Sequence, residues 1–170
     1  MRNIRLATIA MMITLATLMA SVETLIGSPL PFLRLGLANG VTLLVLKWYG
    51  FRSGLLVTLV RIVLAGLITG RLFQPVFLLS FSGGFSAALI MALCMPLENK
   101  WFSLIGISIL GAFFHNLAQL GAASLLVHRF IGVGVLPIVF LAALVTGSLI
   151  GYFALLIDRT AWHNRLLIDR

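Results

Sequence analysis

Long runs of apolar residues, separated by short groups of charged residues, Pro and Gly, dominate the chain. A helix that crosses a bilayer needs about 20 mostly apolar residues, at a rise of about 1.5 Å each. The pattern therefore predicts six membrane-spanning helices joined by short loops. The predicted spans are Leu6–Ile26, Pro31–Trp48, Gly54–Gly70, Pro75–Met95, Trp101–Val127 and Gly132–Ile157.

The second predicted span differs from the others in length. Without its Pro-Phe-Leu-Arg start, its apolar part is Leu35–Leu46, which makes about 18 Å of helix. That length is too short to cross a bilayer alone, so this segment is either tilted or partly re-entrant. The first span has the charged start of a secretory signal, but the spans that follow it favour a retained helix.

The composition supports a membrane protein and excludes a soluble one. Of the 170 residues, 61% are hydrophobic and 9% are charged, and the mean hydropathy is +1.16, whereas a soluble domain is about 25% charged. The predicted fold is an all-α, polytopic six-helix bundle over residues 1–157, followed by a short cytoplasmic tail over 158–170. The net charge of +8 is spread between spans, which indicates topology and not nucleic-acid binding.

Basic residues predict the orientation, because cytoplasmic loops carry more Lys and Arg than outer loops. With both termini inside, eight basic residues fall on the inner side and three on the outer side, while Arg61 lies within a span. We therefore expect an N-in, C-in protein of the bacterial cytoplasmic membrane. The inner residues are Arg2, Arg5, Lys47, Arg52, Lys100, Arg159, Arg165 and Arg170, and the outer ones are Arg34, Arg71 and Arg129.

Four polar residues lie inside otherwise apolar spans: Arg61, His115, Asn116 and Gln119. A charged side chain at this depth costs about 2.5–3.5 kcal/mol on insertion scales, so such residues usually have a partner or a function. His115, Asn116 and Gln119 share one broad helix face, because they are three and four positions apart. They could bind a ligand, or they could form hydrogen bonds between helices. No acidic residue shares the predicted depth of Arg61, so amides, carbonyls, water or an anionic ligand must meet its charge.

Further candidate ligand-binding residues lie near breaks in the spans. Arg34, Asn39 and Arg71 fall toward the predicted outer side, where Arg34 and Asn39 would form part of a gate and arginine would suit phosphate or carboxylate. Ser82 precedes the pair Gly83-Gly84, and adjacent glycines in a helix cost about 1 kcal/mol each relative to alanine. The pair therefore predicts either local unwinding or a close approach of ligand or backbone.

Small residues recur at four-residue spacing, which lets membrane helices pack closely. Examples are Ala16/Ala20 on the first span and Ala143/Gly147/Gly151 on the last. Packing within the bundle explains most of these, and the Ala16/Ala20 pair is the candidate for docking to a partner subunit.

The sequence offers little support for catalysis or for a metal or other cofactor. It has no Gly-rich phosphate loop, no nucleophile elbow and no Asp-rich motif, and Cys94 is the single cysteine. We therefore expect that the chain is not an enzyme by itself.

Four segments together resemble a known family: Arg34-Leu-Gly-Leu-Ala-Asn39, Gly50-Phe-Arg52 with Arg61 following, Leu78-Leu-Ser-Phe-Ser-Gly-Gly84, and Gly111-Ala-Phe-Phe-His-Asn-Leu-Ala-Gln119. They are similar to the Gx transporter family, also labelled heptaprenyl diphosphate synthase component I. That family is similar to the substrate-binding S components of energy-coupling factor transporters. The resemblance covers about residues 29–157.

The two labels imply different functions. Similarity to S components implies a subunit that binds a small molecule for uptake, together with a transmembrane coupling subunit and ATPases. We expect this function, and the polar residues described above favour an anionic or carbonyl-bearing ligand. The synthase label implies an accessory component of isoprenoid diphosphate or quinone metabolism, with a prenyl synthase or redox partner, or a role in quinone-linked electron transfer. Prenyl elongation needs Asp-rich motifs that hold magnesium, which four scattered acidic residues cannot supply.

Overall fold

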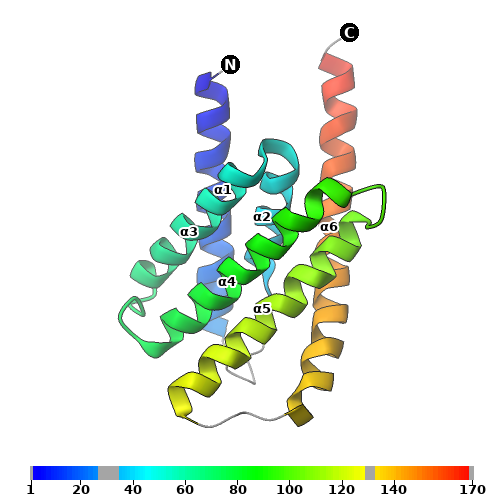
Figure 1. Ribbon diagram of the computed structural model, residues 1–170. Coiled ribbons are helices and arrows are strands. Elements are labelled where there is room, and N and C mark those ends of the chain that lie inside the picture. Colours follow the sequence, from blue (N-terminus) through cyan, green and yellow to red (C-terminus); the bar gives the residue numbers. More distant parts are fainter. Residues whose placement is uncertain (1, 27–34, 129–132, 169–170) are drawn as a thin grey trace.

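The protein is an all-helical bundle in the described part of the computed structural model (Figure 1). The structure describes the backbone of residues 2–26, 35–128 and 133–168, and the side chains of 5–26, 35–128 and 134–161. Within these ranges the chain forms six α-helices and two short 3₁₀ segments. The helices are α1 (Arg2–Ile26), α2 (Leu37–Tyr49), α3 (Phe51–Ile68), α4 (Pro75–Cys94), α5 (Leu104–Val127) and α6 (Leu136–Ile168).

Five of these helices are long and apolar enough to cross a membrane: α1, α3, α4, α5 and α6. The exception is α2, whose 13 residues extend over about 20 Å. The predicted shortness of the second span is therefore confirmed, whereas a sixth full crossing is not shown. The start of that predicted span, residues 31–34, lies outside the described residues.

The short helix α2 occupies the centre of the bundle. It contacts all five of the other α-helices, and eight of its 13 residues are buried. The Thr42 and Thr58 hydroxyls share a hydrogen bond of 3.1 Å between α2 and α3. Because the longer helices surround α2, its polar residues face protein and not lipid.

Glycine allows close packing between α5 and α6. A Cβ added to Gly147 would lie 2.6 Å from Ile109 Cα, and one added to Gly151 would lie 2.8 Å from Ile105 Cα. The predicted role of these small residues in packing within the bundle is confirmed at both positions.

Several helix ends differ from the prediction. Helix α3 begins at Phe51, three residues earlier than expected, because Gly50 with φ of +80° forms the whole connection from α2. Helix α5 begins at Leu104 because the Ser103 hydroxyl accepts a hydrogen bond from the Gly106 N–H and caps the helix. Helix α6 continues to Ile168, so the predicted tail over 158–170 is not separate from the last helix.

Both termini lie at one end of the bundle, and the α3–α4 connection lies at the other (Figure 1). The end of α1 and the start of α2 also approach this second end. The chain thus enters and leaves the bundle on the same side (Figure 1), an arrangement that the predicted N-in, C-in topology requires.

Candidate functional site

A cavity lined by both apolar and charged residues lies toward the end of the bundle opposite the termini (Figure 1). Its volume is about 40 Å³, and its lining includes Arg61, Arg71, Glu23, Asn39 and His115. These residues come from α1, α2, α3, α5 and the α3–α4 connection. We call this space the arginine cavity, because two of its lining side chains are guanidinium groups.

Arg61 meets an amide of α2, as its isolation from acidic residues predicted. Its Nη2 donates a hydrogen bond of 2.7 Å to Asn39 Oδ1, and Arg61 is only 5% exposed. The Asn39 Nδ2 atom lies 3.1 Å from His115 Nδ1. Arg61 and Asn39 are 22 positions apart in the sequence, and Asn39 and His115 are 76 positions apart. The sequence pattern therefore indicated three residues that are distant along the chain but close in space.

Asn39 lines the arginine cavity, and the prediction that it forms part of a gate with Arg34 stays a prediction. It is 6% exposed and belongs to the first turn of α2, where its N–H donates to Gly36 O at 2.8 Å. Gly36 adopts φ of +74°, a conformation that favours glycine. The Glu23 carboxylate accepts a 2.7 Å hydrogen bond from the Gly36 N–H, so the end of α1 fixes the start of α2 over the cavity.

Of the three arginines that were predicted on the outer side, the structure describes Arg71. Arg71 lines the cavity, and its N–H donates to Gly66 O at 2.8 Å in the turn that ends α3. Arg34 lies outside the described residues, as does Arg129. The prediction that Arg34 belongs to the site therefore stays a prediction.

The glycine pair of α4 accommodates side chains of the protein itself. A Cβ on Gly83 would lie 2.7 Å from Gln119 Cγ and 3.0 Å from His115 Nε2. A Cβ on Gly84 would lie 3.4 Å from Arg61 Nη2. The neighbours of both glycines are side chains and not backbone, so a close approach of a ligand stays a prediction. Helix α4 is continuous through both glycines, so the alternative of local unwinding is wrong.

Asn116 and Gln119 are fully buried, with exposures of 1% and 0%. The Gln119 side chain lies against α4 at Gly83, and neither residue is part of the cavity lining, unlike His115. Neither amide atom of Gln119 has a hydrogen-bond partner among the described residues. Unpaired buried amides usually bind water or ligand atoms, so Gln119 remains a candidate for binding a polar atom.

Two other predicted site residues, Ser82 and Ala16, are not part of the cavity lining. Ser82 donates to the Leu79 carbonyl at 3.1 Å within α4, whereas Ser80 lines the cavity. Ala16 is 0% exposed and packs inside the bundle against Val41, Val45 and Val57. The prediction that Ala16 docks a partner subunit is therefore wrong for this arrangement, and Ala20 lines the cavity.

An aromatic row that the sequence analysis missed begins at the cavity. Phe77 lines the cavity, and its ring centroid lies 6.4 Å from that of Phe81, which in turn lies 5.9 Å from that of Phe85. The three residues are four positions apart on α4, a spacing that places them on one helix face. Phe81 and Phe85 are 40% and 36% exposed, so the row extends from the arginine cavity onto the outer surface of α4.

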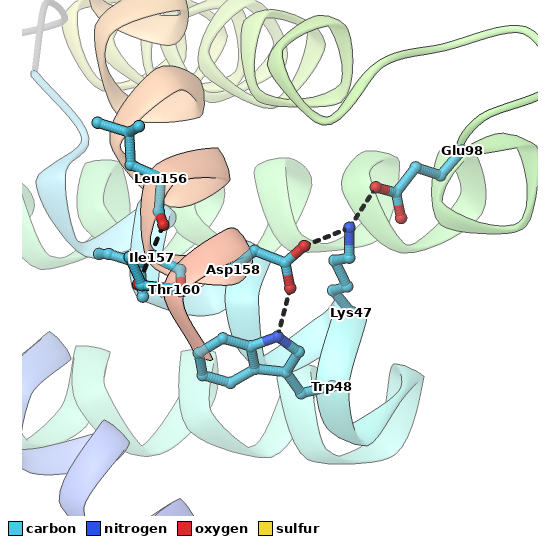
Figure 2. Close-up of polar contacts among 7 residues, drawn as sticks. All are labelled: Lys47, Trp48, Glu98, Leu156, Ile157, Asp158 and Thr160. Atoms are coloured by element: carbon cyan, nitrogen blue, oxygen red, sulfur yellow. Dashed lines mark hydrogen bonds and ion pairs between the residues drawn. The ribbon is translucent and has the colours of Figure 1, made fainter. Parts of the chain in front are cut away.

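A second polar cluster joins three elements at the end of the bundle nearer the termini (Figure 2). Lys47 Nζ lies 2.6 Å from Glu98 Oε1 and 2.8 Å from Asp158 Oδ2. The Trp48 indole Nε1 donates a 2.7 Å hydrogen bond to Asp158 Oδ1. We call these four residues the Lys47 cluster. It links the end of α2 to α6 and to the α4–α5 connection.

Three members of the Lys47 cluster, Lys47, Trp48 and Glu98, lie outside the five long apolar helices, whereas Asp158 lies near the end of the apolar part of α6. Burial lowers the pKa of Lys47, but its hydrogen bonds with Asp158 and Glu98 and their negative charges outweigh burial, so the pKa is raised above 10.5. Lys47 therefore stays charged at neutral pH. Each of these residues lay near a predicted loop, and no spacing in the sequence indicated that they would meet.

A model of the family described as heptaprenyl diphosphate synthase component I matches residues 12–157. The chain belongs to this family. The matched range contains every residue of the arginine cavity and of the glycine pair. No curated protein and no solved structure matches the chain. The family part of the sequence resemblance is thus confirmed, while similarity to S components stays a prediction.

Proposed function

We propose that this chain is a non-catalytic membrane component of a system that makes isoprenoid diphosphates. In this role it binds the anionic head of a prenyl diphosphate in the arginine cavity. The family description supports the isoprenoid part of the proposal. The observation that carries the binding part is the presence of Arg61 and Arg71 in the lining of one cavity.

The chemistry of the cavity fits an anion. Arginine presents planar donors that match phosphate oxygens in pairs. The cavity contains two guanidinium groups but only one carboxylate, that of Glu23. A bound phosphate group would compensate the excess positive charge, which is costly to bury in a membrane protein.

The aromatic row fits the apolar part of such a ligand. Phe77 is the member of the row that also lines the cavity, and Phe81 and Phe85 continue along α4. A prenyl chain that leaves the cavity at Phe77 could follow these rings toward the lipid. The present cavity of about 40 Å³ has room for a few water molecules only. The surrounding helices must therefore move apart when the head group binds.

A partner would supply the catalytic step. Prenyl elongation depends on carboxylates that hold magnesium against diphosphate, and the chain contains four Asp and Glu residues in total. Two of these, Glu98 and Asp158, pair with Lys47 far from the arginine cavity. We therefore assign the elongation chemistry to a separate prenyl synthase subunit.

Binding of farnesyl diphosphate to the purified protein in detergent tests the proposal. We expect Arg71→Gln to weaken binding by tenfold or more, and Arg52→Gln to leave it unchanged. Arg52 is the matched control because it is an exposed arginine at the other end of α3. Failure of the folded wild-type protein to bind, or equal losses in the two variants, would overturn the proposal.

One observation favours a second candidate, uptake of a small anionic ligand by an S-component-like subunit. The start of α1, the start of α3 and the α4–α5 connection lie toward the end of the bundle opposite the arginine cavity (Figure 1), and these segments carry the basic residues Arg5, Arg52 and Lys100. If this basic end is cytoplasmic, the cavity lies toward the outer side. The same assay separates the two functions. Uptake predicts that small carboxylates or phosphates without an apolar tail bind as tightly as the prenyl compound.

A further inference from the structure

The Asn39 side chain joins two groups of the arginine cavity in a fixed orientation. A guanidinium group has donors and no acceptor. Arg61 Nη2 lies 2.7 Å from Asn39 Oδ1, and the reverse orientation of the amide would place two donors face to face. The Asn39 oxygen therefore faces Arg61, and its NH₂ group faces His115 Nδ1 at 3.1 Å.

This orientation fixes the protonation of His115. An amide NH₂ group can only donate, so His115 Nδ1 must accept and cannot carry a proton. The neutral imidazole then carries its proton on Nε2. A charged imidazolium has donors at both nitrogens and could not keep the hydrogen bond with Asn39 in this orientation.

We propose that Asn39 couples anion binding at Arg61 to the uptake of one proton by His115. The inference rests on the proposed anion-binding function of the arginine cavity. When an anion accepts hydrogen bonds from Arg61 Nη2 and draws the guanidinium group away from Asn39, the Asn39 amide is no longer held in one orientation. The amide can then rotate and accept from a protonated His115 Nδ1. The proton comes from water, and no covalent bond other than the new N–H changes.

The surrounding charges favour the same coupling. Arg61, Arg71 and Glu23 line the cavity together with His115, so a further positive charge is unfavourable there until an anion enters. Helix α4 contains no Asp, Glu, Lys, Arg or His. Of these five residue types α2 contains only Lys47, which lies at the opposite end of the helix from Asn39. Up to Ile157, the one titratable group of α6 is Tyr152, which is 52% exposed. Glu23 is therefore the main rival as proton acceptor.

Proton uptake during sulfate binding tests the coupling. Sulfate is a suitable probe because its own charge is constant where histidine titrates, between about pH 5 and 8. Calorimetry in two buffers of different ionisation enthalpy counts the protons. We expect uptake of up to about one proton per bound sulfate, and an affinity that rises up to about tenfold per unit fall in pH. Uptake should disappear in His115→Gln and persist in Glu23→Gln.

The outcomes separate the two proposals. Sulfate binding without proton uptake, or with uptake that persists in His115→Gln, would overturn the coupling and leave the anion site intact. If the folded wild-type protein bound neither sulfate nor farnesyl diphosphate, both proposals would be overturned.

A measurement on the wild-type protein does not depend on the folding of a variant. Nitrogen NMR of histidine-labelled protein should show one neutral imidazole with its proton on Nε2 in the absence of anion, and its conversion to imidazolium when sulfate is added. His128, exposed at the end of α5, is the internal reference. A His115 signal with the proton on Nδ1, or one that follows His128 with and without sulfate, would overturn the coupling.

Discussion

Gly83 lies so close to Gln119 that a Cβ on the glycine would be 2.7 Å from Gln119 Cγ. The contact joins α4 to α5 at the level of His115, which would lie 3.0 Å from the same added atom. The glycine is therefore required by the buried polar side chains of α5 and not by any bend in α4.

We expect Gly83→Ala to destabilise the protein by about 1–3 kcal/mol, because overpacking displaces buried neighbours. Gly121→Ala is the matched control. Gly121 is exposed on α5, and a Cβ there meets nothing within 4 Å, so this change should be neutral or stabilising by up to about 1 kcal/mol. Unfolding in detergent measures both, and equal stability of the two variants would contradict the packing described here.

Ala16→Leu tests whether the first helix uses its small residues inside the bundle. Ala16 is fully buried against α2 and α3, so the larger side chain should cost about 1–3 kcal/mol of stability. Ala10→Leu, at an exposed position of the same helix, should have little effect. If Ala16→Leu were as stable as wild type but lost a membrane partner, Ala16 would be a docking residue after all.

Lys47→Ala should destabilise the protein by about 1–3 kcal/mol, because Glu98 and Asp158 lose their shared cation while half-buried. Lys100→Ala removes an exposed lysine from the neighbouring turn and serves as the control. The readout is the free energy of unfolding. A loss as small as that of the control would show that the Lys47 cluster is a solvated surface contact.

The contribution of Lys47 should also depend on alkaline pH. Its pKa is raised in the folded protein because hydrogen bonds with Asp158 and Glu98 outweigh its burial. A raised folded-state pKa stabilises the protein fully below the unfolded value, about 10.4, and the stabilisation is lost as pH rises through the folded value. The stability difference between wild type and Lys47→Ala should therefore be constant at neutral pH and shrink above about pH 10. If this stability difference instead shrank as the pH fell from neutral, in a range where the carboxylates are still charged, the pH dependence would belong to a group other than Lys47.

Hydrophobic pattern and charge placement predicted the helices well, because long apolar runs in a membrane protein have few alternatives to helix. The helix ends at Phe51 and Leu104 required local details, namely the backbone of Gly50 and the hydroxyl of Ser103. The absence of an acidic residue at the depth of Arg61 predicted an amide, carbonyl, water or anionic ligand as its partner, and the Asn39 amide is one of these.

The parts that could not be predicted depend on distant pairs. Nothing local in the sequence shows that Lys47 meets Asp158, or that Asn39 lies between Arg61 and His115. The aromatic row of α4 could have been found from its four-residue spacing, but its connection to the cavity depends on how α3 and α4 pack. Conversely, Ala16 fitted a docking pattern by spacing alone, and only its burial shows that it faces inward.

The short central helix gives the arginine cavity an electrical property. Helix α2 extends over about 20 Å, whereas the hydrocarbon layer is about 30 Å thick, so Asn39 at its first turn lies below the level that a full-length helix would reach. An ion that moves to Asn39 therefore crosses part of the transmembrane potential. Moving one charge across the whole potential is worth about 2.3 kcal/mol per 100 mV. Occupancy of the cavity by an anion would respond to the membrane potential as well as to concentration.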